Sequence, residues 1–177
     1  MRLSVWTSFV GRAAALALPG SGWQDSSLIK KGIDCMLLET ALELGILLLL
    51  AILTGAMVFF SLVMAPLIFI KLDAPVASRF IRAVFPWYYL CIILLSGAAS
   101  ALLTQLELPL ALLMALITLT ALYNRFLLLR RINRLRDAAK KGDNVADAQF
   151  KQSHRLSVWI NAAQMLTVIV VLSMYYL

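Results

Sequence analysis

Four long stretches without a charged side chain constrain the fold of this chain more than any other feature. They are residues 44–70, 83–106, 108–124 and 156–177. A helix that crosses a hydrocarbon core of about 30 Å needs about 20 predominantly apolar residues, and the first, second and fourth stretches reach that length. The third is shorter, but apolar residues continue after Arg125, whose side chain can extend toward the headgroups. Because lipid offers the backbone no hydrogen-bond partner, all four stretches predict helices.

The overall composition agrees with a membrane domain. Of the 177 residues, 62% are hydrophobic and 14% are charged, against about 45–50% and about 25% in a soluble domain. We therefore expect an all-α membrane protein, a bundle of four transmembrane helices at about 44–70, 84–106, 108–129 and 155–177. The net charge of +7 does not indicate nucleic-acid binding, because the positive charge lies beside apolar stretches, where it sets topology.

The connection between the first two spans predicts a short interfacial helix of its own. Asp73 can cap this helix, and Pro75 is tolerated in its first turn. Its apolar stripe and its arginines suit a headgroup boundary. Pro86 is expected to mark the entry to the second span. The aromatic side chains that follow fit a membrane-interface belt, namely Trp87, Tyr88 and Tyr89.

The connection between the last two spans is polar and predicts a helix end followed by a helix start. Gly142 is expected to end the third helix. Asn144, with Asp147 in the following turn, resembles a cap for the fourth helix. The fourth helix would then begin in water and enter the bilayer near Leu156.

The distribution of Lys and Arg predicts the orientation. The two connections on one side hold Lys71, Arg79, Arg82, Arg125, Arg130, Arg131, Arg134, Arg136, Lys140, Lys141, Lys151 and Arg155. The short turn on the other side holds none, and the N-terminal segment holds Arg2, Arg12, Lys30 and Lys31. The positive-inside rule then places the basic connections in the cytoplasm, facing anionic headgroups, and both termini in the periplasm of a bacterial inner membrane.

Residues 1–35 differ in composition from the transmembrane domain expected over 36–177. Their apolar run is interrupted by Arg12 and is too short to span a membrane. The segment could be a signal peptide, a transit-like presequence or an amphipathic appendage. Alternatively, Met36 is the natural start of the chain.

Uncharged polar residues supply the candidate site. His154, the only histidine, begins a face of the fourth helix that continues through Ser157, Asn161 and Gln164. The other spans add Thr54, Ser61, Thr120 and Asn124. These residues either form interhelical hydrogen bonds or line a small polar cavity open to the cytoplasm. Charged residues near mid-span are absent from the sequence stretches above, which argues against a proton pump based on intramembrane carboxylates.

We expect no metal site and no cofactor. His154 lacks a second histidine, and on a helix Met165 lies about 16 Å further along the axis. Cys35 and Cys91 form no metal-binding or haem-attachment motif, and a disulfide between them is not expected.

Two further features concern helix packing. Gly97 and Ala101 form a small-residue surface on the second span, which allows close approach of another helix in the bundle or in a second protomer. Pro66 removes a backbone donor and is expected to kink the first span.

Three motifs together carry a family resemblance. "GAMVFFSLVMAPLIF" supplies glycine, phenylalanine and proline, "FPWYY" precedes the second span, and "HRLSVWIN" begins the fourth. The residues of the first two motifs are Gly55, Phe59, Pro66, Phe69, Phe85, Pro86 and Tyr88. Over about Leu44 to Leu177 the chain resembles the transmembrane protein 205-like family. The resemblance implies a four-helix integral membrane protein with no established catalytic activity.

These observations favour a non-enzymatic accessory or small-solute-handling membrane protein. A membrane enzyme or cofactor-handling protein that uses the His154/Asn161 face is the alternative. A third possibility is a structural subunit of a homo-oligomer or larger membrane complex, assembled through the Gly97–Ala101 surface.

Overall fold

The computed structural model describes residues 26–176. Most of the predicted N-terminal extension (residues 1–25) and Leu177 therefore lie outside the described residues. The chain divides into two units, residues 1–44 with Leu177 and residues 45–176. In the described part of the first unit the backbone is helical, and the Thr40 hydroxyl donates to the Met36 carbonyl at 2.9 Å.

The described residues form helices joined by short turns, and they contain four helices long and apolar enough to cross a membrane. The predicted all-α, four-span fold is thereby confirmed, and the chain is a multi-pass membrane protein. The first span is built from α2 (Ser26–Phe59), the π-helical turn η1 (Phe60–Met64) and α3 (Ala65–Lys71). The others are α4 (Ala74–Leu103), then α5 (Leu108–Tyr123) with η2 (Asn124–Leu128) and α6 (Leu129–Ala139), and finally α7 (Asn144–Tyr176).

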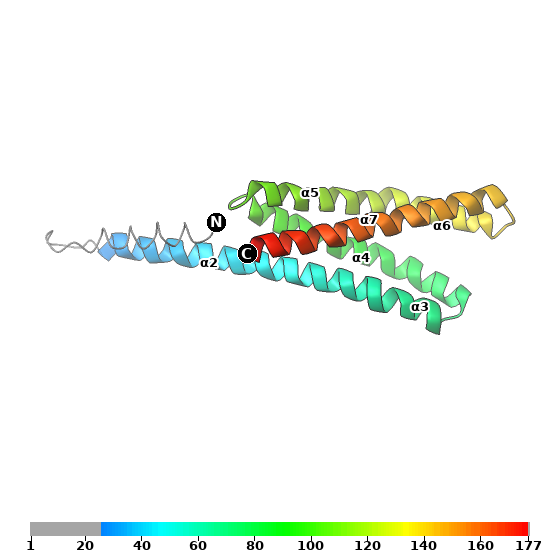
Figure 1. Cartoon of the computed structure of the whole chain (residues 1–177), viewed down its shortest axis with the longest axis horizontal. Coiled ribbons are helices and arrows are strands. Elements are labelled where there is room, and N and C mark those ends of the chain that lie inside the picture. The colour runs from blue at the N-terminus through cyan, green and yellow to red at the C-terminus, as the bar shows by residue number, and fades with distance from the viewer. Residues whose placement is uncertain (1–25, 177) are drawn as a thin grey trace. The chain divides into compact units, whose positions relative to one another are not determined.

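Within the second unit, neighbouring helices lie side by side (Figure 1). The helix α4 packs along α5 across the turn at residues 104–107, and α7 packs against α6 and α5. Gly97 on α4 lies against α5, because a Cβ placed there would be 3.7 Å from Thr118 Cγ2. Ala101 is exposed. Gly97 therefore serves packing within this chain.

The π-helical turn η1 lies directly before Pro66, where the sequence predicts a distortion of the first span. Proline has no N–H to donate, and its ring crowds the carbonyl one turn earlier. The backbone here forms a wider, π-helical turn, in which the Ala65 N–H donates to the Phe60 carbonyl.

The prediction of a separate interfacial helix between the first two spans is wrong. Residues 74–82 are the first turns of α4, which continues through Pro86 to Leu103. These turns bury Ala77 and Ser78 while Val76 and Phe80 stay exposed, and they belong to the same continuous helix as the span. Asp73 occupies the N-cap position but forms no side-chain capping bond.

Gly142 ends the third helical segment as predicted, with a φ of 95° that suits glycine. The predicted cap of the fourth helix is wrong by one residue. Asp143 Oδ1, not the Asn144 side chain, accepts hydrogen bonds from the backbone N–H groups of Val145 and Ala146, both at 3.0 Å. Asp147 lies in the first turn, as expected.

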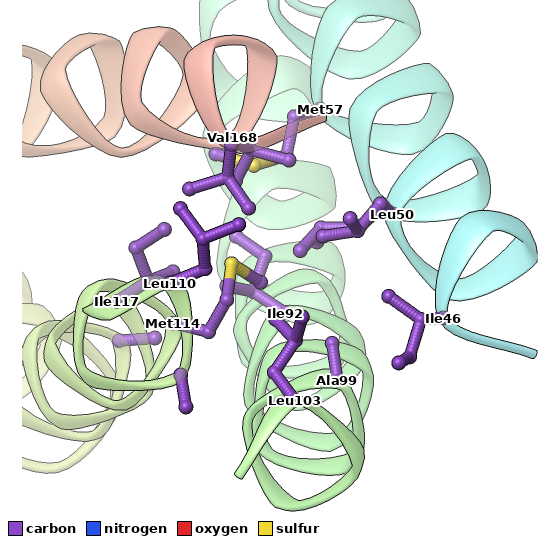
Figure 2. Close-up of a cluster of buried hydrophobic side chains, with 14 of the residues drawn as sticks. Ile46, Leu50, Met57, Ile92, Ala99, Leu103, Leu110, Met114, Ile117 and Val168 are labelled. Carbon is purple, nitrogen blue, oxygen red and sulfur yellow. The ribbon is translucent and has the colours of Figure 1, made fainter. Parts of the chain in front are cut away.

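The apolar core of the second unit gathers side chains from all four spans (Figure 2). Met57, Met114 and Val168 point toward one another at its centre, and each is fully buried. These three residues lie in the half of the bundle that is nearer the turn at residues 104–107. Polar contacts between spans occur both within this part of the bundle, where Ser96 Oγ lies 2.8 Å from Thr118 Oγ1, and on the other side of the core, toward α6.

Candidate polar binding site

Asn161 on α7 connects three helical segments through one carboxamide. Its Oδ1 accepts a hydrogen bond from the Tyr88 hydroxyl at 2.8 Å, and its Nδ2 donates to Ser61 Oγ at 3.0 Å. Tyr88 lies on α4 and Ser61 in η1. Both functional ends of this amide are therefore satisfied by partners from different spans.

Two further contacts of α7 extend the polar region. Ser157 Oγ lies 3.0 Å from the Tyr89 hydroxyl on α4. Gln164 Nε2 donates to Thr120 Oγ1 on α5 at 2.7 Å and approaches the Ile117 carbonyl at 3.4 Å. We call the whole set the polar layer: Ser61, Tyr88, Tyr89, Thr120, Asn124, Ser157, Asn161 and Gln164.

Asn124 differs from the other members because its amide is buried without a partner. Its side chain is only 1% exposed, yet neither Oδ1 nor Nδ2 forms a hydrogen bond with any described part of the chain. Gln164 Oε1 is in the same situation, in a residue that is 4% exposed. Burying an amide without a compensating hydrogen bond costs roughly 1–3 kcal/mol, so these groups are suited to an additional partner.

Three contacts place Asn124 at the level of Asn161. Gln164 with Thr120 fixes α7 against α5, and Tyr88 with Asn161 fixes α7 against α4. The Arg125 guanidinium donates to the Pro86 carbonyl and so joins η2 to α4. Counting from the Gln164–Thr120 contact along these antiparallel helices, Asn161 is about 4.5 Å and Asn124 about 6 Å away in the same direction.

The side chains of the polar layer are all of uncharged types, and this limits the chemistry that the layer can perform. It offers amide and hydroxyl hydrogen bonds but no carboxylate, ammonium or imidazole for acid–base work. Arg125, at its edge, is held by the Pro86 carbonyl instead of extending toward headgroups as expected. Among the described residues no group of three or more His, Cys, Asp or Glu side chains could hold a metal ion.

The structure does not bring His154 into the polar layer. The residue is exposed, and its ring stacks on Phe150 one turn earlier, with centroids 6.0 Å apart. The Arg136 guanidinium also lies over the Phe150 ring, 5.9 Å from its centroid. Partial desolvation, followed by the charge of Arg136, lowers the pKa of His154 below its ordinary value.

The family-motif residues divide between the layer and the outer surface. Tyr88 belongs to the layer, Phe85 packs on its ring at 6.1 Å, and the Pro86 carbonyl accepts from Arg125. The remaining members lie on the exposed side of the first span, namely Gly55, Phe59, Pro66 and Phe69. Thr54 bonds to the Leu50 carbonyl of its own helix and does not join the layer.

Tyr88 was predicted only as a family-motif residue and Tyr89 only as part of an aromatic belt, so neither was predicted as a member of the polar site. Of the three aromatic side chains assigned to a belt, only Trp87 is exposed, and the two tyrosines are buried. The signal that could have identified them is helical spacing. Successive residues of a helix point about 100° apart, so three in a row cannot all face lipid.

Comparison with known proteins gives one family match. The model of the family DUF4149, a domain of unknown function, matches residues 48–141. No curated protein and no solved structure matches the chain. The matched segment includes Ser61, both layer tyrosines and Asn124, and ends before the residues that α7 contributes. Since the match covers more than half of the chain, this protein belongs to the DUF4149 family of domains of unknown function.

Proposed function

We propose that this multi-pass membrane protein binds a small, uncharged, polar solute in its polar layer and acts as a non-enzymatic solute-handling factor. The buried, unpartnered amide of Asn124 within an otherwise hydrogen-bonded layer carries the proposal. A merely structural layer would be expected to satisfy such a group, because an unpaired polar group in a membrane bundle costs free energy. The uncharged composition of the layer favours a neutral solute.

The orientation and setting form part of the same proposal. The basic connections, including α6, would face anionic headgroups in the cytoplasm of a bacterium, with both termini in the periplasm. The polar layer lies between the apolar core and these connections, so the solute would enter from the cytoplasmic side. The motifs around Pro66, Pro86 and Asn161 further support kinship with transmembrane protein 205-like proteins.

The experiment is an unbiased search for the solute. The full chain in lipid nanodiscs is incubated with a bacterial small-molecule extract and washed, and the retained molecules are identified by mass spectrometry. We expect neutral polar molecules to be enriched over an Asn161→Leu variant, which loses two bonds of the layer. Equal retention by both proteins, or enrichment of ions alone, would contradict the proposal.

A further inference from the structure

We infer that Asn124 and Gln164 are the ligand-contacting groups of the polar layer, and that the ligand presents a neutral carboxamide or urea group. The inference rests on the proposed function and names the chemical class of its solute. It starts from two groups of the polar layer that are buried without a hydrogen-bond partner among the described residues, namely the whole amide of Asn124 and the Oε1 of Gln164.

The hydrogen-bonding capacity of these groups defines the complement. Asn124 offers N–H donors from Nδ2 and an acceptor at Oδ1, and Gln164 offers an acceptor at Oε1, because its Nε2 already donates to Thr120. A ligand that satisfies all of them must present one acceptor and at least two N–H or O–H donors. A primary carboxamide or urea has this inventory in one plane, with the carbonyl beside the amino group.

Other common functional groups fit less well. A carboxylate accepts hydrogen bonds but, when ionised, cannot donate to Asn124 Oδ1 or Gln164 Oε1. An ester or ketone has the same defect, and a simple alcohol has one donor for two acceptors. A cation would supply donors but would leave the Asn124 Nδ2 group unsatisfied, and the layer contains no carboxylate to neutralise it.

The surroundings of the layer also suit a small amide. Phe60 stacks on the Tyr88 ring with centroids 4.2 Å apart, and Phe85 meets Phe60 edge-on at 5.4 Å. These rings provide apolar surface beside the hydroxyl that bonds Asn161. The two groups that would hold the ligand lie on segments that pack against each other, η2 and α7.

The test compares three small acetyl probes with one neutral polyol. Saturation-transfer difference NMR on the full chain in nanodiscs measures the binding of acetamide, acetate and methyl acetate, with glycerol as a neutral polyol. We expect acetamide to bind and the other two acetyl probes to bind at least about tenfold more weakly, since each forfeits hydrogen bonds to the layer.

Variants assign the contact to Asn124. Asn124→Leu should weaken acetamide binding at least about tenfold while the protein stays folded, because this amide has no hydrogen bond to lose within the described chain. Asn124→Asp, which keeps the shape but replaces the amide donor, should weaken it similarly. Thr54→Val is the matched control, since Thr54 bonds only within its own helix. Circular dichroism and size-exclusion chromatography verify folding.

The outcomes separate the inference from the proposed function. If glycerol binds while acetamide shows no preference, or if the Asn124 variants bind acetamide like wild type, the inference fails and the proposed function stands. If none of the neutral probes binds and the extract experiment also retains no neutral solute, both fail.

Discussion

Asn161 forms hydrogen bonds through both the oxygen and the nitrogen of its carboxamide, and these bonds connect its helix to two other spans. Its Oδ1 accepts from Tyr88 and its Nδ2 donates to Ser61. In an apolar bundle no water competes for these groups. The alternative to each bond is therefore an unsatisfied buried dipole, and the amide selects one arrangement of α7 against its neighbours.

A double-mutant cycle tests the Tyr88–Asn161 bond. Tyr88→Phe and Asn161→Ala should show a coupling free energy of about 0.6 kcal/mol, the average for interhelical hydrogen bonds in membranes. The free energy of unfolding is measured in detergent by denaturant titration. Tyr123→Phe combined with Asn161→Ala is the control and should be additive, because Tyr123 is exposed. A coupling of zero for the first pair would refute the bond.

At the scale of elements, helix ends and π-helical turns determine where polar residues lie. Ser61 lies in η1, directly before α3, and Asn124 opens η2. A π-helical turn inserts an extra residue into a helix and so rotates the side chains beyond it, and such turns often occur at functional sites. Both polar residues thus lie in locally widened backbone, on the two spans that flank α4 in the sequence.

The start of α7 provides a prediction that distinguishes two adjacent residues. Asp143→Ala should lower the free energy of unfolding by about 1 kcal/mol, because Asp143 Oδ1 satisfies two backbone N–H groups of the first turn. Asn144→Ala should change it by less than about 0.5 kcal/mol. Denaturant titration of both variants measures the difference. A larger effect at Asn144 would restore the cap predicted from the sequence.

The ion pair between Arg82 on α4 and Asp137 on α6 predicts a dependence on pH. Arg82 donates to both carboxylate oxygens and holds the pKa of Asp137 below its ordinary value of 3.8. A carboxyl group with a lowered pKa stabilises the folded state above its ordinary pKa, and this contribution is lost as the pH falls through the lowered value.

Thermal unfolding at several pH values measures this contribution. The midpoint of the wild type should exceed that of Asp137→Asn by a constant amount from pH 7 to about pH 5, and the difference should shrink below about pH 4. Added salt should also reduce it, because the pair is partly exposed. Asp34→Asn, a matched charge change in the first unit, serves as the control. A difference independent of both pH and salt would exclude the ion pair as its cause.

At the scale of the whole molecule, the polar layer and the centre of the apolar core in residues 45–176 lie at different depths, although the α4–α5 contacts Ser96–Thr118 and Ser100–Ala111 lie on the core side. The buried core around Met57 and Met114 lies toward the turn at residues 104–107, and the polar layer lies toward α6. Beyond the layer are the arginines of α6. If the basic connections are cytoplasmic, a solute that enters from the cytoplasm meets the arginines of α6 first, then the polar layer and last the apolar core.

Cysteine labelling tests this orientation. In a chain with Cys35→Ala and Cys91→Ala, a single Gln105→Cys in the exposed turn after α4 should react with a membrane-impermeant maleimide in intact bacterial spheroplasts. Lys141→Cys, in the exposed turn after α6, should react only after lysis. The opposite pattern would invert the proposed topology. Labelling of both positions in intact spheroplasts would place them on the same side of the membrane and so contradict a single span between them.

The sequence by itself determined the class of fold. Charge-free stretches of span length leave the backbone no stable form in lipid except a helix, so the four spans could be predicted from length and composition. Local signals were sufficient where the cause is local: Gly142 ends a helix because its own φ is positive. The polar face of α7 was visible for the same reason, since it follows from helical spacing.

The tertiary structure alone decided which polar residues meet. Nothing local separates Trp87 from Tyr88, yet one is exposed and the other bonds Asn161, because the orientation of α4 depends on its packing against α5. Likewise, the chain beyond Asp73 continues as one helix through Pro86, and Ala77 and Ser78 in its first turns are buried. Contacts between segments far apart in sequence set these choices, and periodicity within one helix contains no information about the partner that covers it.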